Sequence, residues 1–293
     1  MVTYHRLLVP LDGSPASEAA LPVAAAIARR TGASVLLVHI REEIDAAVKL
    51  AESYPSTLRD DPRLADVPEL RADALDGPVQ ETLLAHADTV HADLIVMTSR
   101  GRGGITRALF GSVTDAIVRR AEVPVLVVRP EAGAAPAPGE PPFRRILLPQ
   151  DGSEFAESIV PYVVALAGTE DVHYLVLRVR PALLPDGRIE PGPMLPSPSH
   201  TAWDAHLASI AARVAGRGVL VSERSVTHAV PADVIVEMAA TESVDLIALT
   251  TRGAGGADRM IFGSVADEVV RRAPCSTLVL RPPAPAEPGL PPP

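Results

Sequence analysis

The length and composition of the chain limit the classes to which it can belong. With 293 residues it is about twice as long as an average domain, so we expect two domains. Hydrophobic residues make up 47% and charged residues 22%, as in globular proteins, and the net charge of −9 argues against a nucleic-acid binder. Lys49 is the only lysine, which excludes a Walker A phosphate loop and lysine-based covalent catalysis at any other position.

Cysteine usage and apolar stretches predict where the protein works. Cys275 is the only cysteine, so an intrachain disulfide framework is excluded and a reducing compartment is expected. The first residues lack the charged region, apolar run and cleavage site of a signal peptide. No apolar stretch approaches the roughly 18 residues that span a bilayer. We therefore expect a cytoplasmic protein that does not bind membranes.

The start of the chain alternates predicted strands and helices. Arg6–Pro10 is a short apolar strand that ends at the turn Asp12-Gly13-Ser14. An alanine-rich helix is predicted over Ser17–Thr31, with Gly32 at its C-terminal cap. A fully apolar strand follows at Ser34–Ile40. This strand–helix–strand order is typical of a parallel sheet.

The same alternation continues to residue 128. Residues 42–68 contain only a marginal helical stretch, around 44–53, and apolar strands follow at Asp93–Thr98 and Val125–Val128. Continuous apolar strands between amphipathic helices indicate a parallel sheet that is covered on both faces. We therefore predict an α/β domain of the doubly wound type with a five-stranded parallel sheet.

The second half of the chain repeats the first. Asp93–Pro130 and Asp245–Pro282 align without gaps, with 22 of 38 positions identical, and Arg6–Ala28 matches Arg145–Ala167 at 10 of 23 positions. The second copy has apolar runs at residues 146–148, 174–179, 246–250 and 277–280, and Trp203 is expected to pack a helix in its longer middle. The predicted organisation is two tandem domains, 1–130 and 143–282, with a Pro-rich linker at 131–142 and a disordered tail at 283–293.

The last strand of each copy is expected to lie at an open sheet edge. Val125–Val128 and Thr277–Leu280 are apolar runs, and an exposed apolar edge must be covered. We predict that the two strands face each other across a pseudo-two-fold axis, or meet their equivalents in a second chain.

A first candidate site segment follows the first strand of each copy. Ligands of open parallel sheets bind beyond the carboxyl ends of the strands, near a topological switch point. An aspartate there can accept hydrogen bonds from ribose hydroxyls or an adenine amine. The alternative is an Asx-turn or helix cap that needs no ligand. The segments are Pro10, Leu11 and Asp12 in the first copy, and Pro149, Gln150 and Asp151 in the second.

A glycine-rich loop and a helix start form the second candidate segment. Glycines allow backbone N–H groups to approach an anion, and a helix start favours phosphate. The segments run from Thr98 to Gly104 and from Thr250 to Gly256, followed by Gly111-Ser112-Val113 and Gly263-Ser264-Val265. The alternative is a ligand-free capping box, in which Ser112 pairs with Asp115 and Ser264 with Asp267. These two aspartates would also place negative charge near a bound phosphate.

The remaining patterns indicate no catalytic centre. The third Rossmann glycine is replaced by Thr106, the histidines lack metalloprotease spacing, and no Gly-x-Ser-x-Gly elbow exists. Cys275 opens the last strand and is expected to be a buried small hydrophobe rather than a nucleophile. We name no catalytic residue and no metal ligand.

These motifs resemble the universal stress protein family. The segments VPLDGS, DLIVMTSRGRGG and FGSVTDAIVRRAEVPVLVV carry the resemblance, and it extends over both copies. It implies two domains of the adenine nucleotide α-hydrolase-like, Rossmann-like fold. The ATP-binding branch of the family has Gly-x2-Gly-x9-Gly-Ser/Thr. Gly101 with Gly111 and Gly253 with Gly263 match its last elements, whereas Thr98 and Thr250 replace its first glycine.

The resemblance implies an ATP site in each copy. The aspartate after the first strand would contact adenosine, a backbone group at Ile40 or Val179 would hold adenine, and the loop and helix amides would hold phosphates with or without a Mg or Mn ion. The candidate residues of the first copy are Pro10, Leu11, Asp12, Ile40, Thr98, Arg100, Gly101, Arg102, Gly103, Gly111, Ser112 and Val113. Those of the second are Pro149, Gln150, Asp151, Val179, Thr250, Arg252, Gly253, Gly255, Gly263, Ser264 and Val265.

Three functions stay open at this stage. The first is a nucleotide-binding stress-response module that holds ATP without efficient turnover, more weakly in the second copy, where Ala254 replaces Arg102. The second is a scaffold of the same fold that binds no nucleotide, its copies serving as an internal pseudo-dimer or within a homodimer. The third is a slow ATPase.

Overall fold

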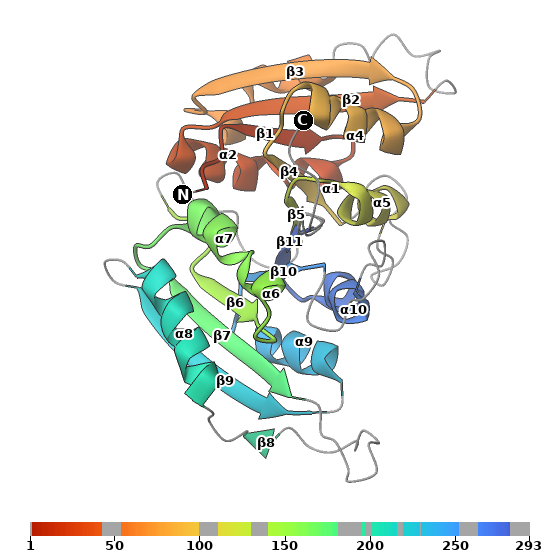
Figure 1. The fold of residues 1–293 in the computed structure, drawn as a ribbon. Coiled ribbons are helices and arrows are strands. Elements are labelled where there is room, and N and C mark those ends of the chain that lie inside the picture. The colour runs from red at the N-terminus through yellow and green to blue at the C-terminus, as the bar shows by residue number, and fades with distance from the viewer. Residues whose placement is uncertain are drawn as a thin grey trace, which may run out of the picture.

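The computed structural model describes residues 2–42, 54–99, 111–129, 140–180, 201–215, 219–228, 230–251 and 263–281, together with the backbone of 195–196. Its centre is one eleven-stranded sheet with the strand order β3-β2-β1-β4-β5-β11-β10-β6-β7-β9-β8. Figure 1 shows the two halves of the sheet meeting at the middle of the molecule, where β5 lies beside β11. Most of the predicted linker and all of the predicted tail lie outside the described residues.

The first copy is a parallel α/β unit, as predicted. Its strands pair in parallel in the order β3-β2-β1-β4-β5. The strands are β1 Arg6–Pro10, β2 Ser34–Arg41, β3 Glu69–Asp76, β4 Leu94–Thr98 and β5 Val125–Val128. The helices are α1 Pro15–Glu18, α2 Leu21–Thr31, α3 Tyr54–Thr57, α4 Val79–Thr89 and α5 Ser112–Arg120, with 3-10 turns at Leu58–Asp60 and Pro62–Leu64.

The second copy repeats this topology, with one addition. Five parallel strands follow the order β9-β7-β6-β10-β11, and the short strand β8, Leu195–Pro196, pairs antiparallel with β9. The five strands are β6 Arg145–Pro149, β7 His173–Arg180, β9 Leu220–Thr227, β10 Leu246–Thr250 and β11 Ser276–Leu280. The helices are α6 Glu154–Glu157, α7 Val160–Ala167, α8 Thr201–Val214, α9 Pro231–Thr241 and α10 Ser264–Arg272.

The single helix predicted over Ser17–Thr31 is instead two helices. Helix α1 ends at Glu18 and α2 begins at Leu21. Pro22 explains the break, because its ring has no N–H to donate and clashes with the carbonyl group four residues earlier. The predicted C-terminal cap is confirmed: Gly32 has φ 76° and donates its N–H to Ala28 O at 2.9 Å. The marginal helix expected around residues 44–53 lies outside the described residues.

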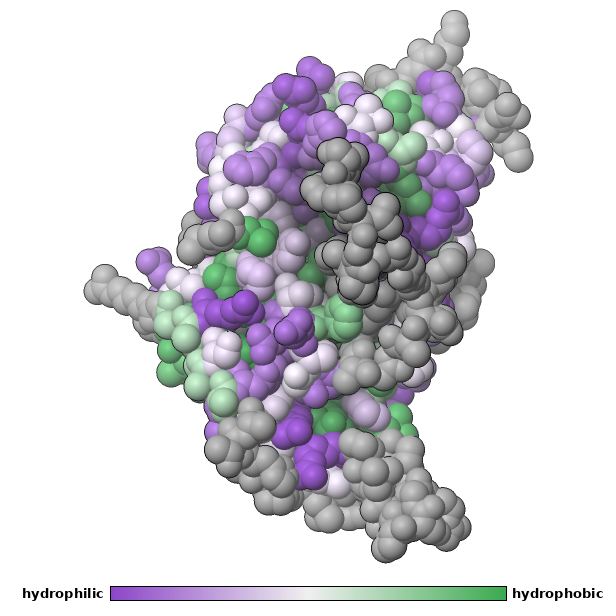
Figure 2. Space-filling view, in the orientation of Figure 1, coloured by the Kyte–Doolittle hydropathy of each residue, from purple (hydrophilic) through white to green (hydrophobic). Residues whose placement is uncertain are grey.

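Apolar side chains cover both faces of the sheet. On one face, α2 and α7 pack with strand residues of both copies into one continuous cluster. On the other face, α4 and α5 cover the first copy, and α9 and α10 cover the second. In the described chain, the large hydrophobic side chains that are exposed are Leu220, Val221, Val230 and Val265. Figure 2 accordingly shows hydrophilic and hydrophobic residues interspersed over the visible face outside the grey atoms.

The last strands of the two copies pair with each other, which confirms the prediction for Val125–Val128 and Thr277–Leu280. Strand β11 pairs antiparallel with β5, and Leu278 stands opposite Leu126. Strand β4 holds the other side of β5, and β10 that of β11. Both edges are therefore occupied within one chain and are closed to a second copy. A second contact joins the copies away from this strand pair: the hydroxyl of Tyr4, in the first copy, donates to Tyr162 O of helix α7, in the second, at 3.1 Å.

We expect the β5–β11 pair to carry a large share of the stability. Leu126 is fully buried in this pair, whereas Leu220 is 64% exposed. Leu126→Ala should lower the free energy of unfolding by about 2–5 kcal/mol, because it removes buried apolar surface and leaves a cavity. Leu220→Ala should change it by less than about 0.5 kcal/mol. Urea denaturation followed by circular dichroism measures both, and equal effects would contradict this account of the interface.

Candidate functional site

The candidate site of each copy lies at a topological switch point of the sheet. In the first copy, β1 has β2 on one side and β4 on the other, and in the second copy β6 lies between β7 and β10 in the same way. The chain leaves the sheet in opposite directions from the carboxyl ends of these central strands. The turn after β1 and the segment after β4 therefore meet at one crevice, where open α/β sheets bind ligands.

The aspartate of the first segment forms an Asx-turn in both copies. Asp12 Oδ1 accepts from Ser14 N at 2.9 Å and from its Oγ at 2.6 Å, and Asp151 Oδ1 accepts from Ser153 in the same geometry. Ser14 and Ser153 in turn cap α1 and α6. The turn alternative is thus correct for one oxygen of each carboxylate. Asp12 is half-buried and Asp151 is exposed.

The helix starts differ from the expected capping boxes. Gly111 and Gly263 are the N-cap residues, with extended backbone angles and no side-chain cap, and Ser112 and Ser264 are already the first helical residues. A capping box needs serine in the extended position that glycine occupies here, so the capping-box expectation is wrong. Both serines are exposed. Neither N-cap glycine has a side chain that could bond to the first amides, so among the described residues these amides and the positive end of the helix dipole are available to an anion.

The acidic residues in the first turn of these helices are paired across the interface of the two copies. Asp115 accepts from Arg119 at 3.0 Å and from Arg271 at 2.6 Å, and Asp267 accepts from Arg271 at 3.2 Å and from Arg119 at 2.5 Å. The aspartates raise the pKa of Arg119, which stays protonated. This arrangement of Asp115, Arg119, Asp267 and Arg271, here called the Asp–Arg quartet, compensates the negative charge expected beside a bound phosphate.

Strand ends and helix starts approach each other closely through glycine. Gly111 N donates to Ser99 O at 3.0 Å, and Gly263 N donates to Thr251 O at 2.8 Å. A Cβ atom would lie 3.3 Å from Ser99 O at position 111 and 2.8 Å from Thr251 O at position 263. Backbone packing therefore requires glycine at position 263 and favours it at position 111, independently of any ligand.

The described residues include only part of the predicted site. Thr98 and Thr250 are buried at the ends of β4 and β10, and the Thr114 hydroxyl donates to Thr98 O at 3.0 Å. Pro10, Leu11, Pro149 and Gln150 lie at the ends of β1 and β6, and the half-buried Ile40 and Val179 lie near the ends of β2 and β7. Arg100, Gly101, Arg102, Gly103, Arg252, Gly253 and Gly255 lie outside the described residues.

Sequence reasoning missed a polar cluster beside the first copy's site. His39 is buried, and its Nδ1 lies 2.8 Å from Leu11 O. Its ring meets Tyr54 edge to face at 5.3 Å, and the Tyr54 hydroxyl donates to Glu18 Oε1 at 2.9 Å. Burial and the nearby Glu18 raise the pKa of Tyr54, so the phenol stays protonated. These residues come from three separate elements, and no local motif indicates that they meet.

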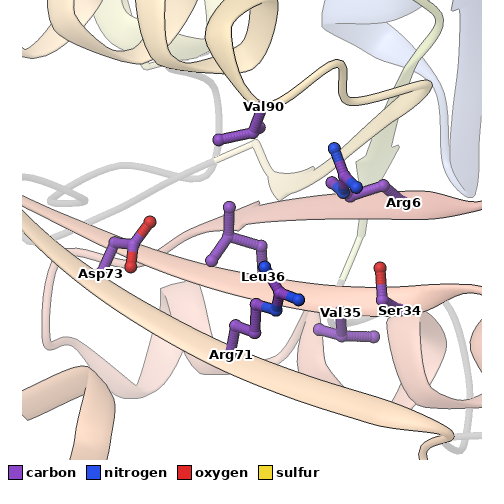
Figure 3. Close-up of a pocket in the computed structure, with 7 residues that line it drawn as sticks. All are labelled: Arg6, Ser34, Val35, Leu36, Arg71, Asp73 and Val90. Atoms are coloured by element: carbon purple, nitrogen blue, oxygen red, sulfur yellow. The ribbon is translucent and has the colours of Figure 1, made fainter.

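A surface pocket of about 200 Å³ lies at the opposite edge of the sheet. Figure 3 shows Arg6 and Ser34, which start β1 and β2, among the residues that line it. Its lining residues are Arg6, Ser34, Val35, Leu36, Arg71, Asp73 and Val90. Asp73 is partnered by His86 Nε2 at 3.1 Å. Because this pocket lies at the amino ends of the strands, it is separate from the candidate nucleotide site.

Other kinds of site find no support in the described part of the chain. No group of three or more His, Cys, Asp or Glu side chains there could hold a metal ion. None of its helices is both long and apolar enough to cross a membrane. Cys275 is buried, as expected, and burial raises the pKa of its thiol to about 12, which makes it a poor nucleophile.

We expect the two helix-start glycines to differ in their tolerance of alanine. Gly→Ala at a compatible backbone position stabilises a protein by about 0.4–1 kcal/mol, so a net loss here reports steric conflict. Gly263→Ala should destabilise the chain by about 1–3 kcal/mol, because the added Cβ overlaps Thr251 O. Gly111→Ala, with more room at Ser99 O, should cost less. Urea denaturation of both variants tests this order, and an unchanged stability of Gly263→Ala would disprove the close-packing role.

Comparison with known proteins adds to this geometry. The family model described as "Universal stress protein family" matches residues 3–129 and again 142–281. A universal stress protein of Mycobacterium tuberculosis strain H37Rv is 35% identical over 138 residues, which cover 42% of this chain and 45% of that protein. The chain thus spans less than half the length of this relative in the match.

One solved structure that covers nearly the whole chain has the same fold. A universal stress protein from Archaeoglobus fulgidus matches 95% of this chain and 97% of its own, with a TM-score of 0.65 and 18% identity. A universal stress protein solved in complex with cAMP matches 44% of this chain and 98% of its own, at 26% identity and a TM-score of 0.38. Two family matches in sequence thus coincide with the two copies in the structure. The chain belongs to the universal stress protein family and carries two of its domains in tandem.

Proposed function

We propose that this protein is a stress-response module that binds ATP in both copies and holds it without efficient turnover. One observation carries the proposal. In each copy, a helix start without a side-chain cap and an aspartate turn flank the same switch point of the sheet. The first offers donors to phosphate and the second offers a carboxylate to ribose or adenine.

The charges around the helix starts suit a triphosphate. Lys49 is the only lysine, so backbone amides must supply most of the donors. The exposed starts at Ser112 and Ser264 provide such amides, and the dipoles of α5 and α10 favour an anion there. The Asp–Arg quartet supports this role, because its two arginines offset the two carboxylates nearest to the expected phosphates.

The remaining contacts follow from the family resemblance and are part of the same proposal. Asp12 and Asp151 would hold the adenosine end, and backbone groups of Ile40 and Val179 would hold adenine. Amides of Gly101 and Gly253 would join the phosphate contacts. The amides of Gly103 and Gly255 would also contact the phosphates. Positive charge would come from Arg100, Arg102 and Arg252.

The copies should differ in affinity, and the bound ATP should be stable. Ala254 replaces Arg102, so the second copy should bind ATP more weakly. A Mg or Mn ion would be held mainly by the phosphates, because the described residues provide no cluster of metal ligands. We propose no general base, since Asp12 and Asp151 each use Oδ1 for a turn and His39 Nδ1 is committed to Leu11 O.

Asparagine substitutions test the nucleotide site without disturbing the turn. Asp12→Asn keeps an amide oxygen for Ser14 but removes the charge that would accept from the ligand. Loss of a charge-assisted hydrogen bond should weaken ATP binding at that copy by about 10- to 100-fold. Asp151→Asn should do the same in the second copy. The exposed helical residue Asp88 provides the matched control Asp88→Asn.

Titration calorimetry of the full chain should give two ATP per chain for wild type and Asp88→Asn, and one tight site for either single variant. Denaturation of freshly purified protein should release adenine nucleotide, which chromatography of the supernatant detects. Neither heat nor released nucleotide would favour the scaffold alternative. Steady production of phosphate from bound ATP would favour the slow ATPase.

A further inference from the structure

The second copy has a row of polar side chains across three neighbouring strands, where the first copy is largely apolar. Gln150 N donates to Leu177 O at 2.8 Å, so Gln150 continues the parallel register one residue beyond Pro149 and stands beside Arg178. Arg178 is paired in turn with Ser225 of β9. Side chains alternate between faces along a strand, so these three lie on one face of the sheet.

Gln150 leaves a buried acceptor unused. The residue is 3% exposed, and its Nε2 donates to Ala156 O at 3.0 Å. A carbonyl group can only accept, so the amide nitrogen must face Ala156 and the amide oxygen must face away. Gln150 Oε1 is buried and has no hydrogen-bond partner in the described part of the molecule, and the same is true of Ser225 Oγ.

Arg178 lies beneath helix α8 with an aromatic ring as its neighbour. Its Cζ is 4.6 Å from the centre of the Trp203 ring. Trp203 is 3% exposed and donates its Nε1–H to Glu223 Oε1 at 2.5 Å. The guanidinium group makes no ion pair with a carboxylate of the described residues. It therefore offers a planar set of donors beside two unused oxygens.

A histidine of α8 adds a third unused atom. The His206 ring stacks on Trp203 at 4.9 Å, and its Nδ1 lies 2.5 Å from Glu157 Oε1. A carboxylate can only accept, so Nδ1 carries the proton, and Nε2 faces the interior. This Nε2 is buried and lacks a partner in the described chain.

The equivalent positions of the first copy have no such unused atoms among the described residues. Leu11 and Ala74 stand where the second copy has Gln150 and Ser225, and His39 stands where it has Arg178. His39 is bonded to Leu11 O, and Tyr54, which takes the place of the α8 residues, donates to Glu18. The fold therefore does not require the unused polar atoms, and each such atom destabilises a protein unless something binds it.

We infer that the second copy holds a binding site of its own under α8, for a small carboxylate that also carries a hydroxyl group. The Arg178 guanidinium binds the carboxylate in a bidentate manner. The ligand hydroxyl donates to Gln150 Oε1, with His206 Nε2 as a second acceptor, and a carboxylate oxygen of the ligand accepts from Ser225 Oγ. Trp203 covers the site and excludes water. This inference does not rest on ATP binding.

Thermal unfolding of the full chain with L-malate and with succinate tests the site. The two dicarboxylates differ by one hydroxyl group. At saturating concentration, malate should raise the Tm by at least about 2 °C, and succinate by clearly less. Three single variants install the residue that the first copy has at the equivalent position: Gln150→Leu, Ser225→Ala and Arg178→His. Each should remove the malate shift. Ser209→Ala, at an exposed position of α8, is the control for Ser225→Ala and should keep it.

The ligand-free proteins give an independent readout. Gln150→Leu should raise the Tm without any ligand, because it removes the unsatisfied buried oxygen of the amide and installs the apolar residue of the first copy. No malate shift in wild type would overturn the site and leave ordered water as the occupant of the row. Equal shifts with succinate would overturn the role of Gln150 as acceptor for a hydroxyl group. Loss of an ATP-dependent shift in Gln150→Leu would assign the row to the nucleotide site and overturn a separate one.

Discussion

The antiparallel pairing of β5 with β11 is the constraint on which the rest of the structure depends. It joins two parallel sheets into one and buries the apolar edge that each copy would otherwise expose. It also brings the C-terminal end of β5 against α10, where Arg129 donates to Val270 O at 2.8 Å and to Arg271 O at 2.9 Å. Helices α5 and α10 each pack on the sheet of their own copy. The strand pairing therefore places the two helices next to each other (Figure 1), and Arg119 of α5 reaches Asp267 of α10.

This placement lets each copy change the charge beside the other copy's candidate site. An aspartate in the first turn of a helix stabilises the helix dipole but opposes an incoming anion. Arg119 and Arg271 each bridge to the aspartate of both helices, so the stabilising charge is kept and its repulsion of a ligand is reduced. The pairs are partly exposed, and each contributes little to stability, about 0.2–1 kcal/mol. Their importance lies in the local potential rather than in holding the copies together.

The central strands could be predicted from the sequence, and the outer ones could not be located. Strands β1, β2, β4 and β5 are continuous apolar runs because they are buried on both faces. Strand β3, in contrast, is the first strand of the described sheet and pairs there only with β2. Its residues Glu69–Asp76 alternate polar with apolar and stay half-exposed. Such a segment gives only a weak strand signal. Strand β9 also gives a weak signal, because most of its residues are polar and exposed or half-buried, although it pairs with β7 and with the short β8.

The candidate site was predictable where it depends on local chain geometry. The turn at Asp12 and the glycine at position 111 are local features. The first follows the predicted strand β1, and the second lies at the predicted helix start. The choice of helix cap was not predictable, since Gly111 and Ser112 both favour that position. Contacts such as Tyr54 with Glu18, or Trp203 with Arg178, join segments far apart in the chain. No spacing rule for a single segment can reveal them.

The two copies have diverged where their contacts are not shared. The interface is pseudo-symmetric, so β5 and α5 contact their own counterparts β11 and α10. A change in that segment must therefore suit both copies at once, and the two segments keep 22 of 38 residues in common. In the described part of the chain, the middle of each copy packs mainly against elements of its own copy. There the short helix α3 covers the first copy's row with Tyr54, and the longer α8 covers the second copy's row with Trp203. Duplication thus leaves one segment bound to the interface and the other free to take on a different ligand.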